Sequence, residues 1–270
     1  MNYSSGPGQS TPGYLNKSLD SKFVRNTNHT DRPQEPILVL TGAGISAESG
    51  IPTFRGNEGL WKQYRAQDLA TPQAFEQNPH LVWQFYDWRR QVIASCKPNS
   101  AHLILTEMEQ VFLEFLILTQ NVDGLHFQAG NKQVLELHGS IWALKCITCD
   151  HRWTDREVPL PELPPRCPSC NGLARPDVVW FGESLNPWIM KKAEEASRSS
   201  KTMLVIGTSA LVQPANLLPL IARGSGSHLI EFNLEPTSLS PYADGCHFGP
   251  AGKTLPLWWN EFNPSEGFLL

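Results

Sequence analysis

Short apolar runs bounded by turn residues recur through this chain, and several of the segments between them carry helical patterns. An uninterrupted apolar run of about 4–8 residues is typical of a strand that is buried on both faces, as in a parallel sheet. Strands that alternate with helices favour a fold in which helices cover both faces of the sheet. We therefore predict an α/β fold with a doubly wound, Rossmann-like parallel sheet. The predicted strands are Ile37–Leu40, Phe115–Leu118, Val134–Leu137, Thr202–Ile206 and Leu229–Phe232.

The pattern turns helical over residues 59–97, where apolar residues from Phe75 to Val92 recur near three- and four-residue spacing. Pro72 and Pro79 suit the first turns of helices. This stretch is predicted to be a helical insertion after the first strand. A further helix is predicted to open at residues 98–102 and to pack Leu103, Leu105 and Met108 on the sheet, and another covers residues 186–198.

The turn after the first strand carries a glycine pattern. Gly42, Gly44 and Ala47 fit the fingerprint G-x-G-x-x-G/A, in which small residues permit a tight strand-to-helix turn and let backbone N–H groups approach a pyrophosphate. On its own the pattern is weak, because short glycine patterns recur by chance. Pro52 breaks the following helix early, so residues 50–56 are predicted to form an ordered loop beside the cofactor turn.

Composition narrows the class of protein. With 40% hydrophobic and 18% charged residues, the chain can bury a substantial core. A net charge of −4 gives no general attraction for nucleic acid, and no apolar run reaches the ~20 residues that a membrane span needs. No N-terminal apolar segment suggests secretion, so we expect an intracellular protein. Residues 1–35 are predicted to be a disordered tail because they are polar and rich in Gly and Pro, and residues 263–270 are predicted to be a second tail.

Four of the six cysteines form two C-x-x-C pairs, Cys146 with Cys149 and Cys167 with Cys170. The 17 residues between the pairs fit the spacing of tetrahedral zinc sites. Four thiolates leave no open coordination position, so the predicted Zn²⁺ is structural and closes a small ribbon. A redox dithiol is the alternative, but it needs one exposed pair and does not explain two.

Polar residues follow several predicted strands, at the edge of the sheet where ligands bind in open α/β folds. Gln120, Asn121 and Asp123 come after the second strand, and their amide and carboxylate groups suit a pocket for a carboxamide and ribose hydroxyls. His138 ends the third strand. A lone histidine there is more often structural, although imidazole is the side chain best able to accept a hydroxyl proton near neutral pH. The turn formed by Gly207, Thr208 and Ser209 is suited to phosphate oxygens. The turn formed by Asn233, Leu234 and Glu235 is suited to a ribose.

The stretch GAGISAESGIPTFRG begins at Gly42 and TQNVDGLH begins at Thr119. With the pair His138–Gly139, the four cysteines and Gly207–Ser209, these motifs resemble the sirtuin family of NAD-dependent protein deacylases over about residues 37–257. The resemblance implies that NAD lies across the carboxyl edge of the sheet and that an acyl-lysine enters opposite it, in a cleft between two lobes. The implied products are nicotinamide, free lysine and O-acyl-ADP-ribose.

The same resemblance implies roles for individual residues. The amide oxygen of the acyl-lysine attacks the ribose carbon that bears nicotinamide, and His138 is the general base that activates a ribose hydroxyl. Asp123 holds the nicotinamide carboxamide, while Gln120 and Asn121 contact its ribose or order a water. Further cofactor positions are Ala43, Ile45, Ser46, Glu48, Thr53, Phe54, Arg55, Trp61, Val122 and Ala251, and substrate-peptide positions are Val179, Phe181, Gly182 and Glu183.

Tyr86 and Arg89 are three apart in the predicted helical insertion and so share a helix face. Spacing alone is more typical of a solvated surface arginine. The pattern Tyr-x-x-Arg, however, resembles class III sirtuins of the desuccinylase/demalonylase type, whose pocket recognises acyl chains ending in a carboxylate. This implies removal of succinyl, malonyl and glutaryl groups with weak deacetylase activity, and Ala66 matches a small residue that widens the same pocket. The alternative is a deacetylase without preference for acidic acyl groups.

Two other classes of function are disfavoured. A zinc-containing dehydrogenase lacks an open metal position, and a zinc-ribbon interaction module without chemistry does not explain why every polar motif residue is present. The predicted catalytic domain spans residues 36–262, its substrates are acylated proteins, and no direct contact with nucleic acid or membrane is expected. A mitochondrial address is favoured over cytoplasm or nucleus only by the resemblance. The predicted large NAD-binding lobe comprises residues 36–58, 98–140 and 175–262, and the small lobe comprises the insertion 59–97 and the zinc ribbon 141–174.

Overall fold

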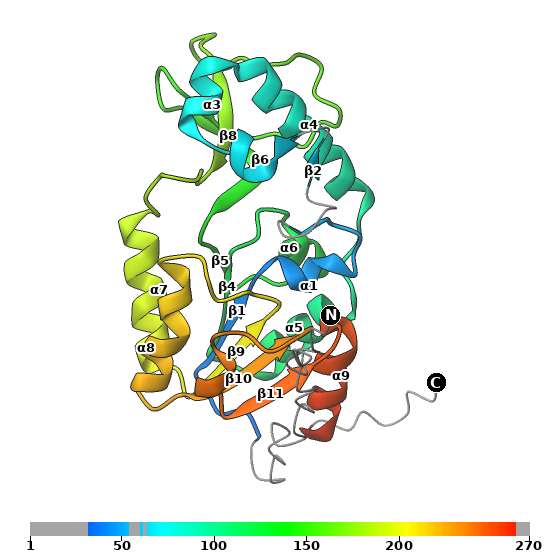
Figure 1. The fold of residues 1–270 in the computed structure, drawn as a ribbon, viewed down its shortest axis with the longest axis vertical. Helices are drawn as coiled ribbons and strands as arrows, with labels where there is room; N and C mark the ends of the chain where they lie inside the picture. The colour runs from blue at the N-terminus through cyan, green and yellow to red at the C-terminus, as the bar shows by residue number, and fades with distance from the viewer. Residues whose placement is uncertain (1–31, 54–59, 62–63, 263–270) are drawn as a thin grey trace, which may run out of the picture.

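The computed structural model describes residues 32–53, 60–61 and 64–262. They form a large lobe around a parallel sheet and a small lobe of helices and antiparallel strands (Figure 1). Within these ranges, no helix has both the length and the apolarity needed to cross a membrane. The sequence predicts a tail up to residue 35, but Gln34 is hydrogen-bonded to the sheet. Its N–H donates to the Thr202 hydroxyl at 2.8 Å, and its carbonyl accepts a hydrogen bond from the same hydroxyl at 3.0 Å.

The sheet of the large lobe has six parallel strands in the order β11-β10-β9-β1-β4-β5. This confirms the predicted α/β fold with a doubly wound parallel sheet. The sequence pattern did not predict β11, which lies at the sheet's edge and is too polar to read as an apolar run. The strands are β1 (Ile37–Thr41), β4 (Phe115–Thr119), β5 (Val134–Glu136), β9 (Thr202–Ile206), β10 (His228–Asn233) and β11 (Gly245–Phe248).

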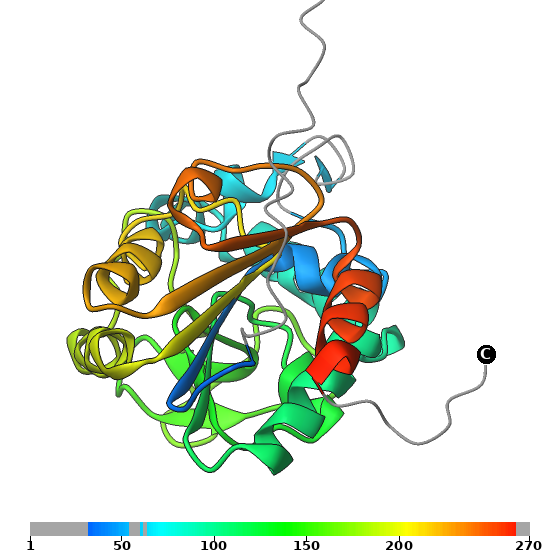
Figure 2. The same ribbon diagram turned by 90° about the horizontal axis from the view of Figure 1, so that it is seen from below.

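Helices cover both faces of this sheet (Figure 2). In β1, Ile37 and Val39 pack in one core cluster with α5 (Ser100–Val111) and α9 (Ala251–Phe262), whereas Leu38 and Leu40 pack in another with α7 (Pro187–Ser199) and α8 (Leu218–Gly224). Successive strand residues point to opposite faces, so a strand buried on both faces must be apolar throughout. The large lobe also contains α1 (Ala43–Ala47), α6 (Leu125–Ala129) and the 3₁₀ turns η3 (Ala215–Leu217) and η4 (Ser240–Tyr242).

One predicted contact of α5 is wrong. Leu105 and Met108 are fully buried against the sheet, but Leu103 is 54% exposed. Positions two apart on an α-helix are separated by about 200° around its axis, so Leu103 and Leu105 cannot face the same sheet. The apolar residue at position 103 therefore belongs to the solvent side of the helix.

The small lobe combines the insertion after β1 with the segment that holds the cysteines (Figure 1). The sequence predicts a helical insertion, but it begins with a two-stranded antiparallel ladder of β2 (Leu60–Trp61) and β3 (Tyr64–Arg65). Pro72 and Pro79 begin α3 and α4 as predicted, and the preceding Thr71 and Asn78 side chains cap these helices. The remaining elements are α2 (Ala66–Leu69), α3 (Pro72–Gln77), α4 (Pro79–Ser95), β6 (Gly139–Cys146), β7 (Arg152–Thr154) and β8 (Ala174–Val178).

Candidate functional site

The candidate residues gather because the strands of the large sheet end at one level. Thr41 of β1 is paired with Thr119 of β4 and with Ile206 of β9, which in turn is paired with Phe232 of β10. The chain winds from β1 toward β5 on one side and later toward β11 on the other. The turns after β1, β4 and β9 therefore meet at the topological switch point, where ligands bind in doubly wound folds.

Two glycine turns pack directly against each other at this edge. The Gly44 N–H donates to the Gly207 carbonyl over 2.8 Å, and a Cβ added to Gly44 would lie 2.7 Å from the Gly207 Cα. Gly207 has a φ of +61°, which side chains disfavour, and an added Cβ there would meet the backbone N of Ile45. The Gly44 N–H thus joins the two turns and is not among the backbone N–H groups that remain for a pyrophosphate. The small residues allow this close approach of the two backbones.

Helix α1 is short, and it ends before the chain reaches Pro52, the residue that the sequence predicts as its breaker. It ends at Ala47, and the chain turns at Gly50, whose φ is +94°. The exposed Glu48 accepts a hydrogen bond of 2.7 Å from the N–H of Gly252, the residue after the buried Ala251. Two predicted cofactor positions therefore lie at the junction of α1 with the start of α9, where a carboxylate stabilises the exposed N–H end of the helix.

Asp123 lies in a buried hydrogen-bond network. Its carboxylate accepts hydrogen bonds from the Ser46 hydroxyl at 2.8 Å and from the Leu125 N–H at 2.9 Å. Asn121 donates to the Ser46 hydroxyl and to the Gly42 carbonyl. Burial raises the pKa of Asp123, while its two hydrogen bonds and the nearby Arg89 guanidinium act in the opposite direction.

His138 is held in one tautomer by its neighbour. Its Nδ1 lies 2.9 Å from the Gln120 carbonyl oxygen. A carbonyl only accepts, so Nδ1 carries the hydrogen and Nε2 keeps its lone pair. Burial lowers the pKa of His138, while the hydrogen bond to Gln120 acts in the opposite direction. The half-buried ring is therefore neutral at neutral pH and can accept a proton at Nε2.

Thr208 connects three of the predicted turns. Its hydroxyl accepts a hydrogen bond of 3.0 Å from the Gln120 side chain, and its carbonyl accepts one of 2.7 Å from the Asn233 side chain. The turns after β4, β9 and β10 are thus joined in one row along the sheet edge. The remaining predicted positions for phosphate and the adenosine ribose are more open, with Ser209 half-buried and Leu234 and Glu235 exposed.

Two adjoining pockets open beside this row. The first is lined by Ala43, Ser46, Ile51, Pro52, Arg89, Asn121, Val122 and Asp123. The second is lined by Ile51, Pro52, Trp88, Arg89, Val92 and Ile93. Ile51, Pro52 and Arg89 border both, so a residue from α4 reaches the pocket that holds the predicted nicotinamide ligands. The sequence analysis did not predict Ile51 as a site residue. The one indication in the sequence was its position close after the glycine turn.

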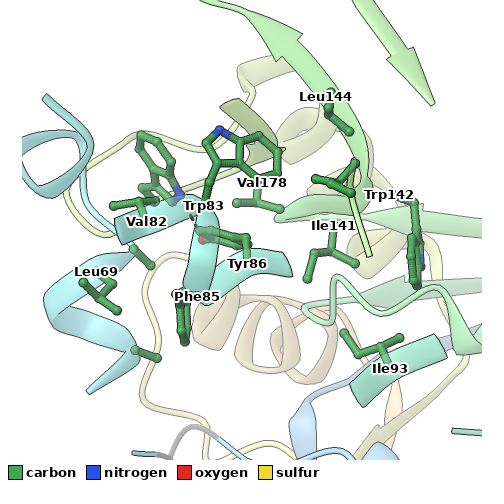
Figure 3. Close-up of a cluster of buried hydrophobic side chains, with 14 of the residues drawn as sticks. Leu69, Val82, Trp83, Phe85, Tyr86, Ile93, Ile141, Trp142, Leu144 and Val178 are labelled. Atoms are coloured by element: carbon green, nitrogen blue, oxygen red, sulfur yellow. Dashed lines mark hydrogen bonds between the residues drawn. The ribbon is translucent and has the colours of Figure 1, made fainter. Parts of the chain in front are cut away.

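Tyr86 and Ala66 lie in the core of the small lobe. Figure 3 shows Tyr86 and Trp83 of α4 beside Val178 of β8. Tyr86 is 4% exposed and Ala66 is 5% exposed. Burial raises the pKa of Tyr86 to about 12, so its phenol keeps its proton at neutral pH.

The segment that carries the predicted substrate-peptide positions is extended only in part. β8 ends at Val178, the Val179 N–H donates to the His138 carbonyl, and a turn joins Trp180 to Glu183. Phe181 and Gly182 are exposed, and Gly182 has a φ of +89°. Both Glu183 carboxylate oxygens accept hydrogen bonds from Arg175. Arg175 was not among the predicted site residues.

Other predicted positions lie at or beyond the edge of the described ranges. Thr53 is half-buried, and Trp61 belongs to β2. Phe54 and Arg55 lie outside the residues that the structure describes.

The four cysteines of the C-x-x-C pairs come together in the small lobe. Their Sγ atoms all lie within 4.8 Å of one another, with 3.5 Å between Cys146 and Cys170 and 3.7 Å between Cys149 and Cys167. Zinc–sulfur bonds of about 2.3 Å in a tetrahedron place sulfurs roughly 3.8 Å apart. The backbone N–H groups of Thr148 and Ser169 lie 3.3 and 3.4 Å from Cys146 and Cys167 sulfurs, as suits thiolates. The cluster is compatible with one structural zinc.

A parallel sheet whose glycine turns meet at its carboxyl edge is the architecture of dinucleotide-binding proteins. Within that class, this chain belongs to the Sir2 family, which its residues 42–214 match. An NAD-dependent protein deacylase of Aquifex aeolicus is 52% identical over 218 residues, covering 81% of this chain and 91% of that protein. A relative of the same description from Leptospira interrogans is 48% identical over 243 residues, covering 88% of this chain and 98% of its own length.

Solved structures agree with this assignment. A Sir2 homolog–NAD complex superposes with a TM-score of 0.80 at 42% identity, covering 84% of this chain and 90% of that one. A Sir2–p53 peptide–NAD⁺ complex superposes with a TM-score of 0.76 at 34% identity, covering 85% of this chain and 94% of that one. Both were solved with NAD, which the sequence predicts as the co-substrate of this chain.

Proposed function

We propose that this chain removes negatively charged acyl groups, namely succinyl, malonyl and glutaryl, from protein lysines, with only weak activity on acetyl-lysine. As a Sir2 family member it is an NAD-dependent protein deacylase, and the descriptions of its relatives name that activity without an acyl group. The observation that carries the acyl preference is the position of Arg89 between the two adjoining pockets.

Arg89 offers a charge where the end of an acyl chain would lie. Trp88, Val92 and Ile93 line the second pocket with it and can contact the methylenes of an acyl chain. A guanidinium can bind a carboxylate with two charge-assisted hydrogen bonds, and the surrounding apolar side chains strengthen them by excluding water. Acetyl ends in a methyl group and makes neither bond.

Tyr86 supplies a second donor near Arg89. The Arg89 guanidinium is close enough to act against the burial that raises the pKa of Tyr86, so the phenol lies in the field of this cation. Because the raised pKa keeps the phenol protonated, it can donate a hydrogen bond to a carboxylate. Ala66 in the same cluster is small, and we propose that it leaves room for acyl chains longer than acetyl.

The residues at the sheet edge fit NAD and the acyl transfer. NAD supplies the ribose carbon from which nicotinamide departs and the hydroxyls that receive the acyl group. Asp123 and Asn121 would bind the nicotinamide end, and the Gly207 and Asn233 turns would bind phosphate and the adenosine ribose. His138 would take the proton of a ribose hydroxyl at Nε2. A related Sir2 homologue structure contains 2′-O-acetyl ADP ribose, a product of this type.

A second function has an observation in its favour. Arg89 and Asp123 attract each other, so Arg89 has a partner within the protein. If that attraction were the reason for Arg89, the enzyme would be a deacetylase without preference for acidic acyl groups. The first function is favoured because Arg89 also borders the second, mainly apolar pocket, where Asp123 is not a lining residue.

The test follows wild-type protein with NAD and two peptides that differ only in carrying succinyl-lysine or acetyl-lysine. We expect nicotinamide release with both and a kcat/KM for the succinyl peptide at least ~10-fold higher, as a charged hydrogen bond implies. Equal rates, or a preference for acetyl, would refute the acyl preference and leave the deacylase assignment intact. Formation of NADH without nicotinamide would refute the deacylase assignment as well.

A further inference from the structure

Tyr86 has a hydrogen-bond partner that its place in the helix does not suggest. The indole N–H of Trp180, 94 residues away, donates to the Tyr86 hydroxyl oxygen over 2.9 Å. Trp180 is 3% exposed and Tyr86 is 4% exposed, so water does not compete with this bond. Trp180 lies in the turn that follows β8 and packs in the same core cluster as the buried residues of α4.

This bond restricts where the Tyr86 proton can point. A phenol has one hydrogen to donate, whereas an indole N–H can only donate. The Tyr86 hydrogen therefore cannot point at Trp180, and the Arg89 guanidinium nearby is also a donor without acceptor capacity. Two donors thus direct the phenolic hydrogen toward an acceptor, and the carboxylate of an acidic acyl group is one.

Trp180 is itself held in place by an ion pair. The Arg175 guanidinium lies 3.5 Å from the centre of the Trp180 ring and donates to both Glu183 carboxylate oxygens at 2.6 and 2.8 Å. One of these oxygens also accepts the Trp180 backbone N–H at 2.8 Å. Phe75 packs on the ring with 5.3 Å between centroids. The indole thus has little freedom to rotate away from Tyr86.

We propose that Trp180 is a positioning residue for acyl selectivity, acting through the Tyr86 hydroxyl, with Arg175 and Glu183 fixing its ring. The inference rests on the proposed function, because it requires acidic acyl groups to be substrates. Trp180 need not touch the acyl chain. Its contribution is to orient the phenol before the substrate arrives, so that less freedom is lost on binding.

A purely structural role for Trp180 would give a different result. A buried tryptophan that only fills space stabilises the fold equally for every substrate. A positioning role instead changes the ratio of two substrates measured on one preparation of protein. The useful pair is a succinyl-lysine peptide and a butyryl-lysine peptide, since the chains have the same length and only one ends in a carboxylate.

The experiment compares Trp180→Phe with wild type on both peptides. This change keeps an aromatic ring and removes the N–H. We expect the succinyl-to-butyryl ratio of kcat/KM to fall roughly 3- to 10-fold, mainly through KM, as the loss of one neutral hydrogen bond implies. In a Tyr86→Phe background, the same change should leave the ratio within about twofold, because the hydroxyl it acts through is gone.

Trp83→Phe is the matched control. Trp83 is fully buried in the same cluster and donates its indole N–H to the Ala174 carbonyl at 2.8 Å. It should lower the melting temperature about as much as Trp180→Phe and leave the acyl ratio unchanged. If Trp180→Phe does not fold, Arg175→Met tests the same chain of contacts at a less buried position, and a lowered ratio is again expected.

Two results would overturn the inference. One is an unchanged acyl ratio in Trp180→Phe or, if that variant does not fold, in Arg175→Met. The other is a fall in the ratio that is as large in the Tyr86→Phe background as in wild type. A wild type that prefers the butyryl peptide would refute the proposed function itself, and is recognised before any variant is made.

Discussion

One hydrogen bond decides how His138 can act. The Gln120 carbonyl fixes a hydrogen on Nδ1 and leaves Nε2 as the acceptor. Burial lowers the pKa of the ring, so the acceptor form persists at neutral pH. The resemblance to sirtuins predicted this residue as the base. The sequence could not predict its tautomer, because the partner, the Gln120 carbonyl, lies 18 residues earlier in the turn after β4.

His138→Ala should leave the fold and NAD binding near normal while lowering turnover at least ~10²-fold, the usual contribution of a positioned base. The measurement is nicotinamide release alongside NAD titration and thermal melting. His80→Ala, at an exposed position of α4, is the matched control and should turn over normally. Full turnover by His138→Ala would show that another group accepts the proton.

At the scale of elements, the apolar runs predicted the buried strands because central parallel strands are covered on both faces. The apolar runs did not predict β11, because an edge strand needs no apolar run. They did not predict the β2–β3 ladder either, because each of its strands has only two residues. The glycine turns were predicted, but their mutual contact was not. Gly42 and Gly207 are far apart in sequence, and only the register of β1 with β9 brings their turns together.

Gly207→Ala tests whether the contact between the glycine turns matters. An alanine would have to adopt a φ of +61° with its Cβ against the backbone of α1. We expect NAD affinity to fall sharply and the melting temperature to drop, because two backbones must separate. Gly224→Ala, where an added Cβ meets nothing within 4 Å, is the control and should be tolerated. Unchanged NAD binding by Gly207→Ala would mean that this contact does not shape the cofactor edge.

The zinc cluster is an element-scale feature because one strand joins it to the candidate base. β6 begins at Gly139, beside His138, and ends at Cys146. Cys146→Ala should lower zinc content and melting temperature, since metal binding contributes to folding of the ribbon. Metal analysis and thermal melting measure both, with Cys246→Ala, a half-buried thiol outside the cluster, as the control. A Cys146→Ala protein that stayed folded and zinc-free would contradict a structural zinc.

At the scale of the whole molecule, the two lobes are linked around the candidate site. The indole N–H of Trp142 in β6 donates to the Asp123 carbonyl at 2.7 Å, so the small lobe fixes the loop that carries the Asp123 carboxylate. Within the small lobe, Arg90, beside Arg89 on α4, donates to Asp155 and Glu157 and so joins α4 to the cysteine-bearing segment. Motif order predicted the lobes, but these contacts could not be predicted, because they join residues 19 to 67 positions apart.

The central claim is that Arg89 selects acyl groups ending in a carboxylate. Arg89→Met keeps a long side chain and removes a charged hydrogen-bond partner worth ~1.5–3 kcal/mol. The most direct measurement is kcat/KM for matched succinyl and acetyl peptides with wild type and Arg89→Met. We predict that the succinyl value falls roughly 10- to 150-fold while the acetyl value changes little. An Arg89→Met protein that hydrolyses succinyl-lysine undiminished, or that loses both activities equally, would contradict the claim.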